Sequence, residues 1–156
     1  MTQTAAALTP DAKSQIADAL NQSVAETAVT TMLAQNFHWN VKGMAFGPLH
    51  DLFQKIYEDH FVAQDDLAER VRAIDAHAEG TLAGMLKRSK IKEHDGNASD
   101  QEMIRMMMDA QVTLASTLAG AGELAASHGD TLTEDLCIAR GQEHEKFAWF
   151  LRAHLS

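Results

Sequence analysis

The chain has 156 residues, 46% of them hydrophobic and only two of them proline, which suffices for one domain with a substantial core. Its formal net charge of −9 argues against nonspecific binding to nucleic acid or to an anionic membrane. No stretch approaches the roughly 18 apolar residues of a membrane span, and the N-terminus lacks a secretory pattern, so we expect a cytoplasmic protein.

Abundant helix formers and scarce β-branched alternation predict an all-α fold. A first helix is expected from Thr9-Pro10 to about Val41, with the threonine as its N-cap and the proline in its first turn. A second helix is expected from Pro48 to about His77 and should be ended by Gly80. Its predicted buried stripe consists of Leu49, Leu52, Phe53, Ile56, Tyr57, Phe61, Leu67, Val71 and Ile74.

The long connection that follows contains a periodic segment, residues 81–90, which predicts a short extra helix. A third long helix should open at Ser99, where Glu102 completes a capping-box spacing. The last one should start at Thr131 or Thr133 and end near His154. Four long helices with one long middle connection predict a ferritin-like four-helix bundle. We expect a single domain over residues 1–156, with residues 1–9 as a short tail.

Four side chains are candidate metal ligands: His38, His50, Asp65 and Glu69. Two imidazoles and two carboxylates together suit one metal ion. His50 and Asp65, however, lie on one predicted helix, where their spacing corresponds to about 22 Å. Because every ligand must approach a common ion to about 2 Å, a shared site requires a second subunit. No glutamate has a histidine three positions later, so the usual di-iron motif inside the bundle is missing.

These candidates also have structural explanations. His38 could be a hydrogen-bonded group at a helix end, and Asp65 with Glu69 could be a solvated pair facing Arg70 or Arg72. Cys137, the single cysteine, is expected to be buried and inert. Core packing is expected of Met103, Met106, Met107 and Met108, and surface or packing positions of His60, His77, His94, His128, His144 and His154.

Several of these features occur together in one known family. The segment NFHWNVKG, from Asn36 to Gly43, contains His38, and His50 follows twelve residues later. The pattern D-x-x-A-E-R begins at Asp65. Together with the short helix in the middle connection, these motifs resemble the Dps family of mini-ferritins over most of the chain.

The resemblance implies a ferroxidase and iron-storage protein that forms a hollow shell of twelve subunits. His38 and His50 of one subunit would face Asp65 and Glu69 of its partner at each two-fold interface. Iron would be the cofactor, Fe(II) and hydrogen peroxide the substrates, and a ferric mineral the product. Trp39 could absorb an oxidising equivalent, or it could simply be a packed aromatic side chain.

One position departs from the family pattern. Gln54 stands one turn after His50, where the family usually has Asp or Glu, so we expect a second iron position to be weakly occupied. If antiparallel copies of the second helix place His50 opposite a point between the two carboxylates, the two-fold axis passes near Glu58 and Asp59.

Two further surfaces have competing interpretations. Asp130, Glu134 and Asp135 resemble the acidic residues that line the family's three-fold iron pore, but acidic residues also suit a helix start. The basic run from Lys87 through Arg88 and Lys90 to Lys92 could bind DNA in a nucleoid-associated protein, although a solvated loop is the simpler interpretation. A DNA-compacting shell with little ferroxidase activity is therefore the main alternative function.

Overall fold

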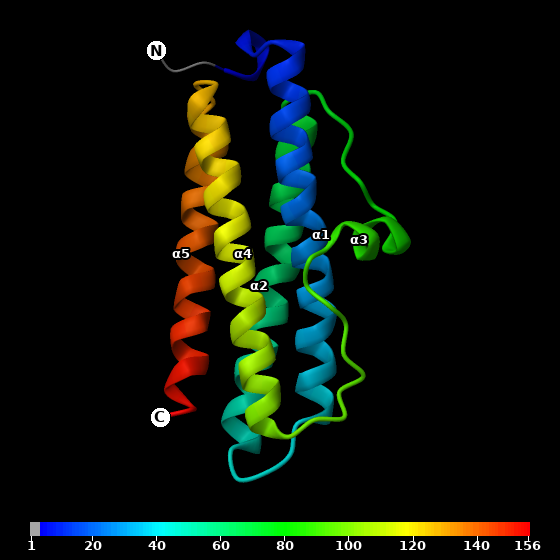
Figure 1. The fold of residues 1–156 in the computed structure, drawn as a ribbon, viewed down its shortest axis with the longest axis vertical. Coiled ribbons are helices and arrows are strands. Elements are labelled where there is room, and N and C mark those ends of the chain that lie inside the picture. Colours follow the sequence, from blue (N-terminus) through cyan, green and yellow to red (C-terminus); the bar gives the residue numbers. More distant parts are fainter. Residues whose placement is uncertain (1–3) are drawn as a thin grey trace.

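The computed structural model describes residues 4–156, which form a bundle of four long helices (Figure 1). These helices are α1 (Pro10–Asn40), α2 (Phe46–Ala73), α4 (Asp100–Ser127) and α5 (Thr131–Ala153). The short helix α3 (Leu82–Arg88) lies in the crossover between α2 and α4 and packs against α1, and a 3-10 turn (Ala5–Ala7) precedes α1. Within residues 4–156 there is no strand, so the all-α prediction and the extra helix are confirmed.

The N-terminal tail is only partly described, since residues 1–3 of the predicted tail fall outside the described range. Leu8 is buried in the hydrophobic cluster that surrounds the first half of α1, so the described part of the tail packs onto the bundle. Thr9 caps α1 as predicted, because its side-chain oxygen accepts a hydrogen bond from the backbone N–H of Ala12 at 3.2 Å.

The crossover is held against α1 by side-chain amides. Asn21 donates to the carbonyl of His77 at 2.9 Å, and Asn36 donates to the carbonyl of His94 at 2.7 Å. These bonds satisfy backbone groups that a loop would otherwise leave unpaired. They also cover the outer side of α1, which explains why this helix is buried on more than one face.

α2 begins two residues before the predicted start and ends four residues before the predicted end. Asp75 adopts a left-handed backbone conformation (φ 65°), and its N–H donates to the carbonyl of Arg72 at 2.9 Å. The N–H of Ala76 donates to the carbonyl of Val71 at 3.1 Å, which completes a Schellman-type helix end. The prediction that Gly80 ends the helix is wrong, because aspartate can adopt this conformation earlier in the chain.

The other helix starts follow side-chain caps. Ser99 and Glu102 form the predicted capping box at α4, with bonds of 2.8 and 3.2 Å. α5, in contrast, is capped by Asp130, which accepts the backbone N–H of Thr133 at 3.1 Å. The predicted start at Thr131 is therefore confirmed, and the cap is the aspartate that precedes the two threonines. The turn at Gly129 (φ 76°) comes directly before the aspartate that caps the helix.

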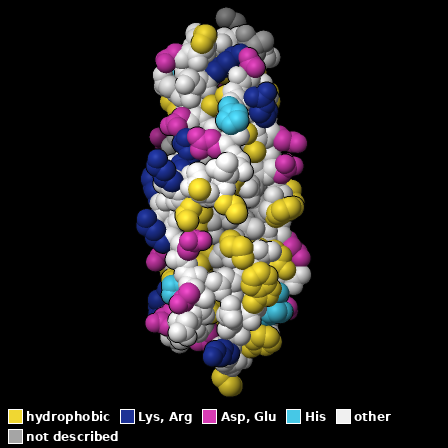
Figure 2. Space-filling view, turned by 90° about the vertical axis from the view of Figure 1, so that its right-hand side faces the viewer, with side chains coloured by type: hydrophobic (Ala, Val, Ile, Leu, Met, Phe, Trp, Pro, Cys, Tyr) yellow, Lys and Arg dark blue, Asp and Glu magenta, His cyan; other side chains and the backbone are white. Residues whose placement is uncertain are grey.

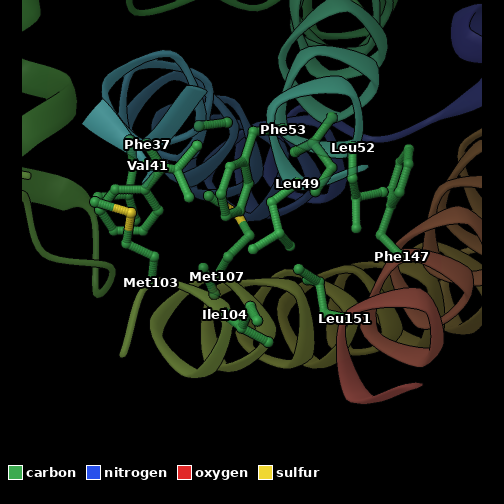
Figure 3. Packing of buried hydrophobic residues seen from close by; sticks show 14 of the residues in the cluster. Phe37, Val41, Leu49, Leu52, Phe53, Met103, Ile104, Met107, Phe147 and Leu151 are labelled. Carbon is green, nitrogen blue, oxygen red and sulfur yellow. The ribbon is translucent and has the colours of Figure 1, made fainter. Parts of the chain in front are cut away.

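The hydrophobic core runs along the bundle axis in two clusters, and the lower one is drawn in Figure 3. Phe37 of α1 and Phe53 of α2 pack edge to face there, with ring centroids 5.6 Å apart. The predicted stripe of α2 is buried except for Tyr57, which is half-buried, and Phe61, which is 72% exposed. Cys137 is buried as expected, and burial raises the pKa of its thiol to about 11.

Of the predicted core methionines, Met103 and Met107 are fully buried. Met106 and Met108 lie partly buried against the lower cluster. No helix in residues 4–156 is long and apolar enough to span a membrane.

Candidate metal centre

His38 and His50 meet at the corner where α1 turns into α2. Their rings stack with centroids 3.6 Å apart and an angle of 20° between the planes. Nδ1 of His38 donates to the backbone carbonyl of His50 at 2.8 Å, and Nδ1 of His50 donates to the carbonyl of His38 at 2.7 Å. The two side chains therefore hold each other through reciprocal hydrogen bonds.

This reciprocal pairing determines which ring nitrogen carries the proton. A backbone carbonyl can only accept a hydrogen bond, so Nδ1 must be the protonated nitrogen in both rings. In the neutral rings, both Nε2 atoms then keep a free lone pair. Fixing one nitrogen on a carbonyl while the other remains available is the usual arrangement of a metal-binding histidine.

The end of α1 explains why the pairing forms. The last four carbonyls of a helix lack partners within that helix, and His38 lies two residues before the last residue of α1, Asn40. The imidazole of His50 supplies a partner for this carbonyl. Val41 is buried directly after the helix and turns the chain toward α2. The site therefore depends on a helix end as well as on the two imidazoles.

Asp65 and Glu69 lie one turn apart and exposed on α2, about 22 Å or more along the helix from His50. Neither is in an ion pair among the described residues. Arg70 instead binds Asp130 at 2.8 Å and Thr133 at 2.8 Å. Within residues 4–156 the alternative explanation, a pairing of these carboxylates with Arg70 or Arg72, is therefore not formed.

A single chain does not close a metal site. Within residues 4–156, no three His, Cys, Asp or Glu side chains come together in a group that could hold a metal ion. The chain presents a histidine pair at one place and a carboxylate pair at another. The structure therefore brings His38 to His50 but does not bring either of them to Asp65 or Glu69.

Gln54, one turn after His50, is engaged within its own helix. Its amide Nε2 donates to Oε1 of Glu58 at 2.8 Å. The amide oxygen of Gln54 has no partner in the described structure and carries no formal charge. A cation beside His50 would meet a neutral oxygen from Gln54 and a carboxylate only one turn further on.

The acidic residues at the start of α5 differ from one another. Asp130 is buried and accepts bonds from Arg70 and from the backbone of Thr133, so its carboxylate is used as a helix cap. Glu134 is half-buried and Asp135 is exposed. Asp135 is therefore the predicted pore residue that solvent ions can reach in the isolated subunit.

A second polar cluster crosses the middle of the bundle, and sequence reasoning did not identify it. Asp59 of α2 accepts two hydrogen bonds from Arg140 of α5, at 3.1 and 2.6 Å, and one from His60 Nδ1 at 3.0 Å. His60 Nε2 accepts from the amide of Gln111 at 3.0 Å, and the amide oxygen of Gln111 accepts from His144 Nδ1 at 2.8 Å. We call these five residues the central polar network.

Charge in the central polar network is concentrated at Asp59 and Arg140. Burial alone would raise the pKa of Asp59, but hydrogen bonds from His60 and Arg140 hold it well below its usual value. Burial lowers the pKa of His60. Burial also lowers the pKa of His144 to about 2, and the nearby His60 and Arg140 add to this effect. Both histidines are packing residues as predicted, but their partners come from three helices and leave no local motif.

The basic run is partly neutralised within the subunit. Arg88 binds Glu79 at 2.7 Å and Asp18 at 2.8 Å, so its guanidinium belongs to a surface ion-pair cluster. Lys87, Lys90 and Lys92 are exposed, and no ion pair is formed by them among the described residues. The run thus spans the last two residues of α3 and the loop that follows, and it carries three exposed lysines.

The bundle with its crossover helix defines a protein of the ferritin-like class, and the model of the ferritin-like domain matches residues 17–156. The chain belongs to the Dps family. It is 36% identical to a DNA protection during starvation protein of Brevibacillus brevis, over 90% of this chain and 94% of that protein. It is 34% identical to general stress protein 20U of Bacillus subtilis, over 90% and 97% of the two chains.

Solved structures agree with this assignment. The Dps protein of Vibrio cholerae O1, described as a member of a broad superfamily of ferritin-like diiron-carboxylate proteins, superposes with a TM-score of 0.93. The two chains are 31% identical, and the match covers 100% of this chain and 98% of that one. The Dps protein from Bacillus brevis gives a TM-score of 0.92 at 34% identity, covering 96% and 100%.

Proposed function

We propose that this chain is the subunit of a mini-ferritin that oxidises Fe(II) at its subunit interfaces and stores the ferric product. The main support for this proposal is the reciprocal pairing of His38 and His50. Each Nδ1 is held by a hydrogen bond to a backbone carbonyl, and both Nε2 atoms remain free. The free, exposed carboxylates of Asp65 and Glu69 complete the ligand set from the other side of the interface.

The partner in this proposal is a second copy of the chain. Two α2 helices running antiparallel can place His50 of one copy opposite the carboxylates of the other, with the two-fold axis near Glu58 and Asp59. Asp65 lines a hollow of about 560 Å³ whose walls include Phe61 and Met85, so apolar surface is exposed beside the carboxylates. Such surface favours burial against another subunit. Six such pairs would form the dodecameric shell.

The residues suit iron oxidation. Imidazole and carboxylate together accept Fe(II), and the charge of Asp65 and Glu69 stabilises the more highly charged Fe(III) product. Two Fe(II) ions supply the two electrons that break the O–O bond of one hydrogen peroxide molecule, and two protons complete two water molecules. Trp39, 63% exposed beside His38, is placed to take up an oxidising equivalent if only one ion is present.

Storage requires a route into the shell. Glu134 and Asp135, near the start of α5, are the acidic residues through which we expect Fe(II) to pass at a three-fold pore. Asp130 contributes less directly, since it is buried and binds Arg70. The ferric product would then mineralise inside.

The test is to add Fe(II) to the protein without oxygen, then hydrogen peroxide, and to follow iron and protein together through a sizing column. Soluble ferric iron that co-elutes with a species of twelve subunits is expected. The same run with His50→Ala should lose oxidation, whereas His77→Ala, which changes an exposed histidine elsewhere, should not. A wild-type shell that oxidises no iron would overturn the ferroxidase proposal.

The second candidate is a DNA-binding shell, which the names of the relatives and the three free lysines of the α3 loop favour. The net charge of −9 opposes it, and Arg88 is already neutralised by two carboxylates. A gel shift at several salt concentrations, with a Lys87→Gln, Lys90→Gln, Lys92→Gln variant as control, separates the two functions. A strong, salt-sensitive shift without iron oxidation would favour the DNA-binding shell.

A further inference from the structure

An aromatic column surrounds the histidine pair. Phe46 stacks on His50 with ring centroids 5.2 Å apart and an angle of 30° between the planes. His38 also stacks on His50, and Tyr57 meets His38 edge to face with ring centroids 5.3 Å apart and an angle of 82° between the planes. In Figure 2, hydrophobic and histidine side chains lie together near the lower end of the molecule, where Figure 1 shows the α1–α2 corner.

Core packing does not account for Phe46. This side chain is 46% exposed and belongs to neither hydrophobic cluster, although it is the first residue of α2. Its position one turn before His50 puts the two rings on the same face of the helix. The aromatic contact recorded for Phe46 within residues 4–156 is the one with the imidazole of His50.

One hydrogen bond does not fix an imidazole in all directions. The Nδ1 bonds of His38 and His50 leave each ring free to tilt about its N–H···O direction. Phe46 lies against His50, and Tyr57 lies against His38, so each ring also has an aromatic neighbour besides its histidine partner. These contacts oppose a tilt that would move Nε2.

We infer that Phe46 and Tyr57 are positioning residues, which hold the Nε2 atoms of His50 and His38 in place for a metal ion. This inference rests on the proposed function, because it concerns the same histidine pair. Neither residue touches the ion. Their role is to reduce the rotational freedom that the imidazoles would lose on binding, which raises affinity without a new ligand.

The test compares matched variants by titration with Co(II) alone, followed by visible absorption, after a sizing column has established that each variant assembles like the wild type. Phe46→Leu removes the ring, and Phe150→Leu makes the same change at a half-buried phenylalanine of α5 whose ring contacts Trp149. We expect Phe46→Leu to bind Co(II) about three- to tenfold more weakly than Phe150→Leu, from the usual strength of an aromatic contact. Phe46→Trp restores a ring and should restore affinity.

Tyr57 gives an independent comparison. Tyr57→Leu should weaken Co(II) binding, and Tyr57→Phe, the conservative variant, should recover it because the ring remains. In iron oxidation, the ring-deleting variants should need more Fe(II) for half-maximal rate while the maximal rate changes little.

The outcomes separate the two levels of the proposal. If Phe46→Leu and Phe150→Leu bind Co(II) equally, and Tyr57→Leu matches Tyr57→Phe, the positioning role is wrong while the site stands. If His50→Ala binds Co(II) as tightly as the wild type, the histidine pair is not the metal site, and the proposed function fails together with this inference.

Discussion

The chain uses histidine in two opposite ways, at the α1–α2 corner and in the middle of the bundle. At the corner, His38 and His50 donate to backbone carbonyls and keep both Nε2 atoms free. In the central polar network, His60 donates to a carboxylate and accepts from an amide, so both of its nitrogens are used inside the subunit.

The difference shows that hydrogen-bond partners, and not residue type, decide whether a histidine keeps a ring nitrogen available to a metal, since His38 is buried too. His60 is fully buried next to Asp59 and Arg140, and its lone pair is occupied. The Nε2 atom of His144 has no hydrogen-bond partner among the described residues, but it is buried. Arg140, whose side chain is charged, lies one helical turn earlier on α5. The corner pair has no fixed charge bound to it within the subunit.

The largest expected effect is on the corner. His38→Ala and His50→Ala should each lower the rate of Fe(II) oxidation by about 100-fold or more, because each removes a ligand and the hydrogen bond that orients the other ring. The double variant should be little worse than either single one, since the two act as a unit. Rates measured at fixed Fe(II) check this.

The matched control is His144→Met, which changes a histidine of the central polar network and should leave the oxidation rate of assembled protein unchanged. An equal loss of rate in His144→Met and His50→Ala would remove the distinction between the two regions.

Next in size is the stability of the central polar network. Arg140→Met leaves Asp59 partly buried without its cation and should destabilise the protein by about 3 kcal/mol, seen as a lower thermal midpoint. Arg88→Met breaks ion pairs with more exposed carboxylates and should cost about 1 kcal/mol or less. Equal losses in both variants would show that Asp59 is not desolvated as described.

Lowering the pH should destabilise the protein through the central polar network. His60 and His144 have folded-state pKa values below the usual 6.5, so the unfolded chain takes up more protons as the pH falls below that value. Stability should therefore be complete above about pH 6.5 and decline between there and about pH 2, with the Asp59 contribution lost in addition below about pH 4.

Thermal midpoints of the metal-free protein between pH 7 and pH 5 measure this decline. His144→Met removes one of the two groups and should flatten the slope, while His77→Ala should leave it unchanged. A slope that is the same in all three proteins would contradict the assignment.

The smallest effect is expected at the departure from the family pattern. Gln54→Asp places a carboxylate one turn after His50 and should raise Fe(II) affinity at the second position about fivefold, the size of a surface charge interaction. Iron bound per interface, measured without oxidant, checks this. Gln142→Asp adds the same charge on α5 and is the control. Unchanged stoichiometry and rate in Gln54→Asp would show that Gln54 does not limit the site.

The sequence by itself determined the elements and the candidate ligands. Three helices are signalled by residues only three or four positions apart, so local chemistry is sufficient to predict where they form. The signals are Thr9 for α1, the periodic segment 81–90 for α3, and Ser99 with Glu102 for α4. The spacing of His50 from Asp65 on one helix already required a second subunit, and the continuous α2 keeps that argument intact. The shared site itself remains a prediction.

Tertiary structure decided what these side chains do. Which nitrogen of His38 and His50 is free depends on carbonyls brought together by a helix corner. The central polar network joins three helices: His60 and Gln111 lie 51 positions apart in the sequence, and Gln111 and His144 lie 33 apart. Asp130 binds Arg70, which lies on α2. Contacts over such separations leave no periodic signal in a sequence, because they are set by how helices pack and not by the residues next in the chain.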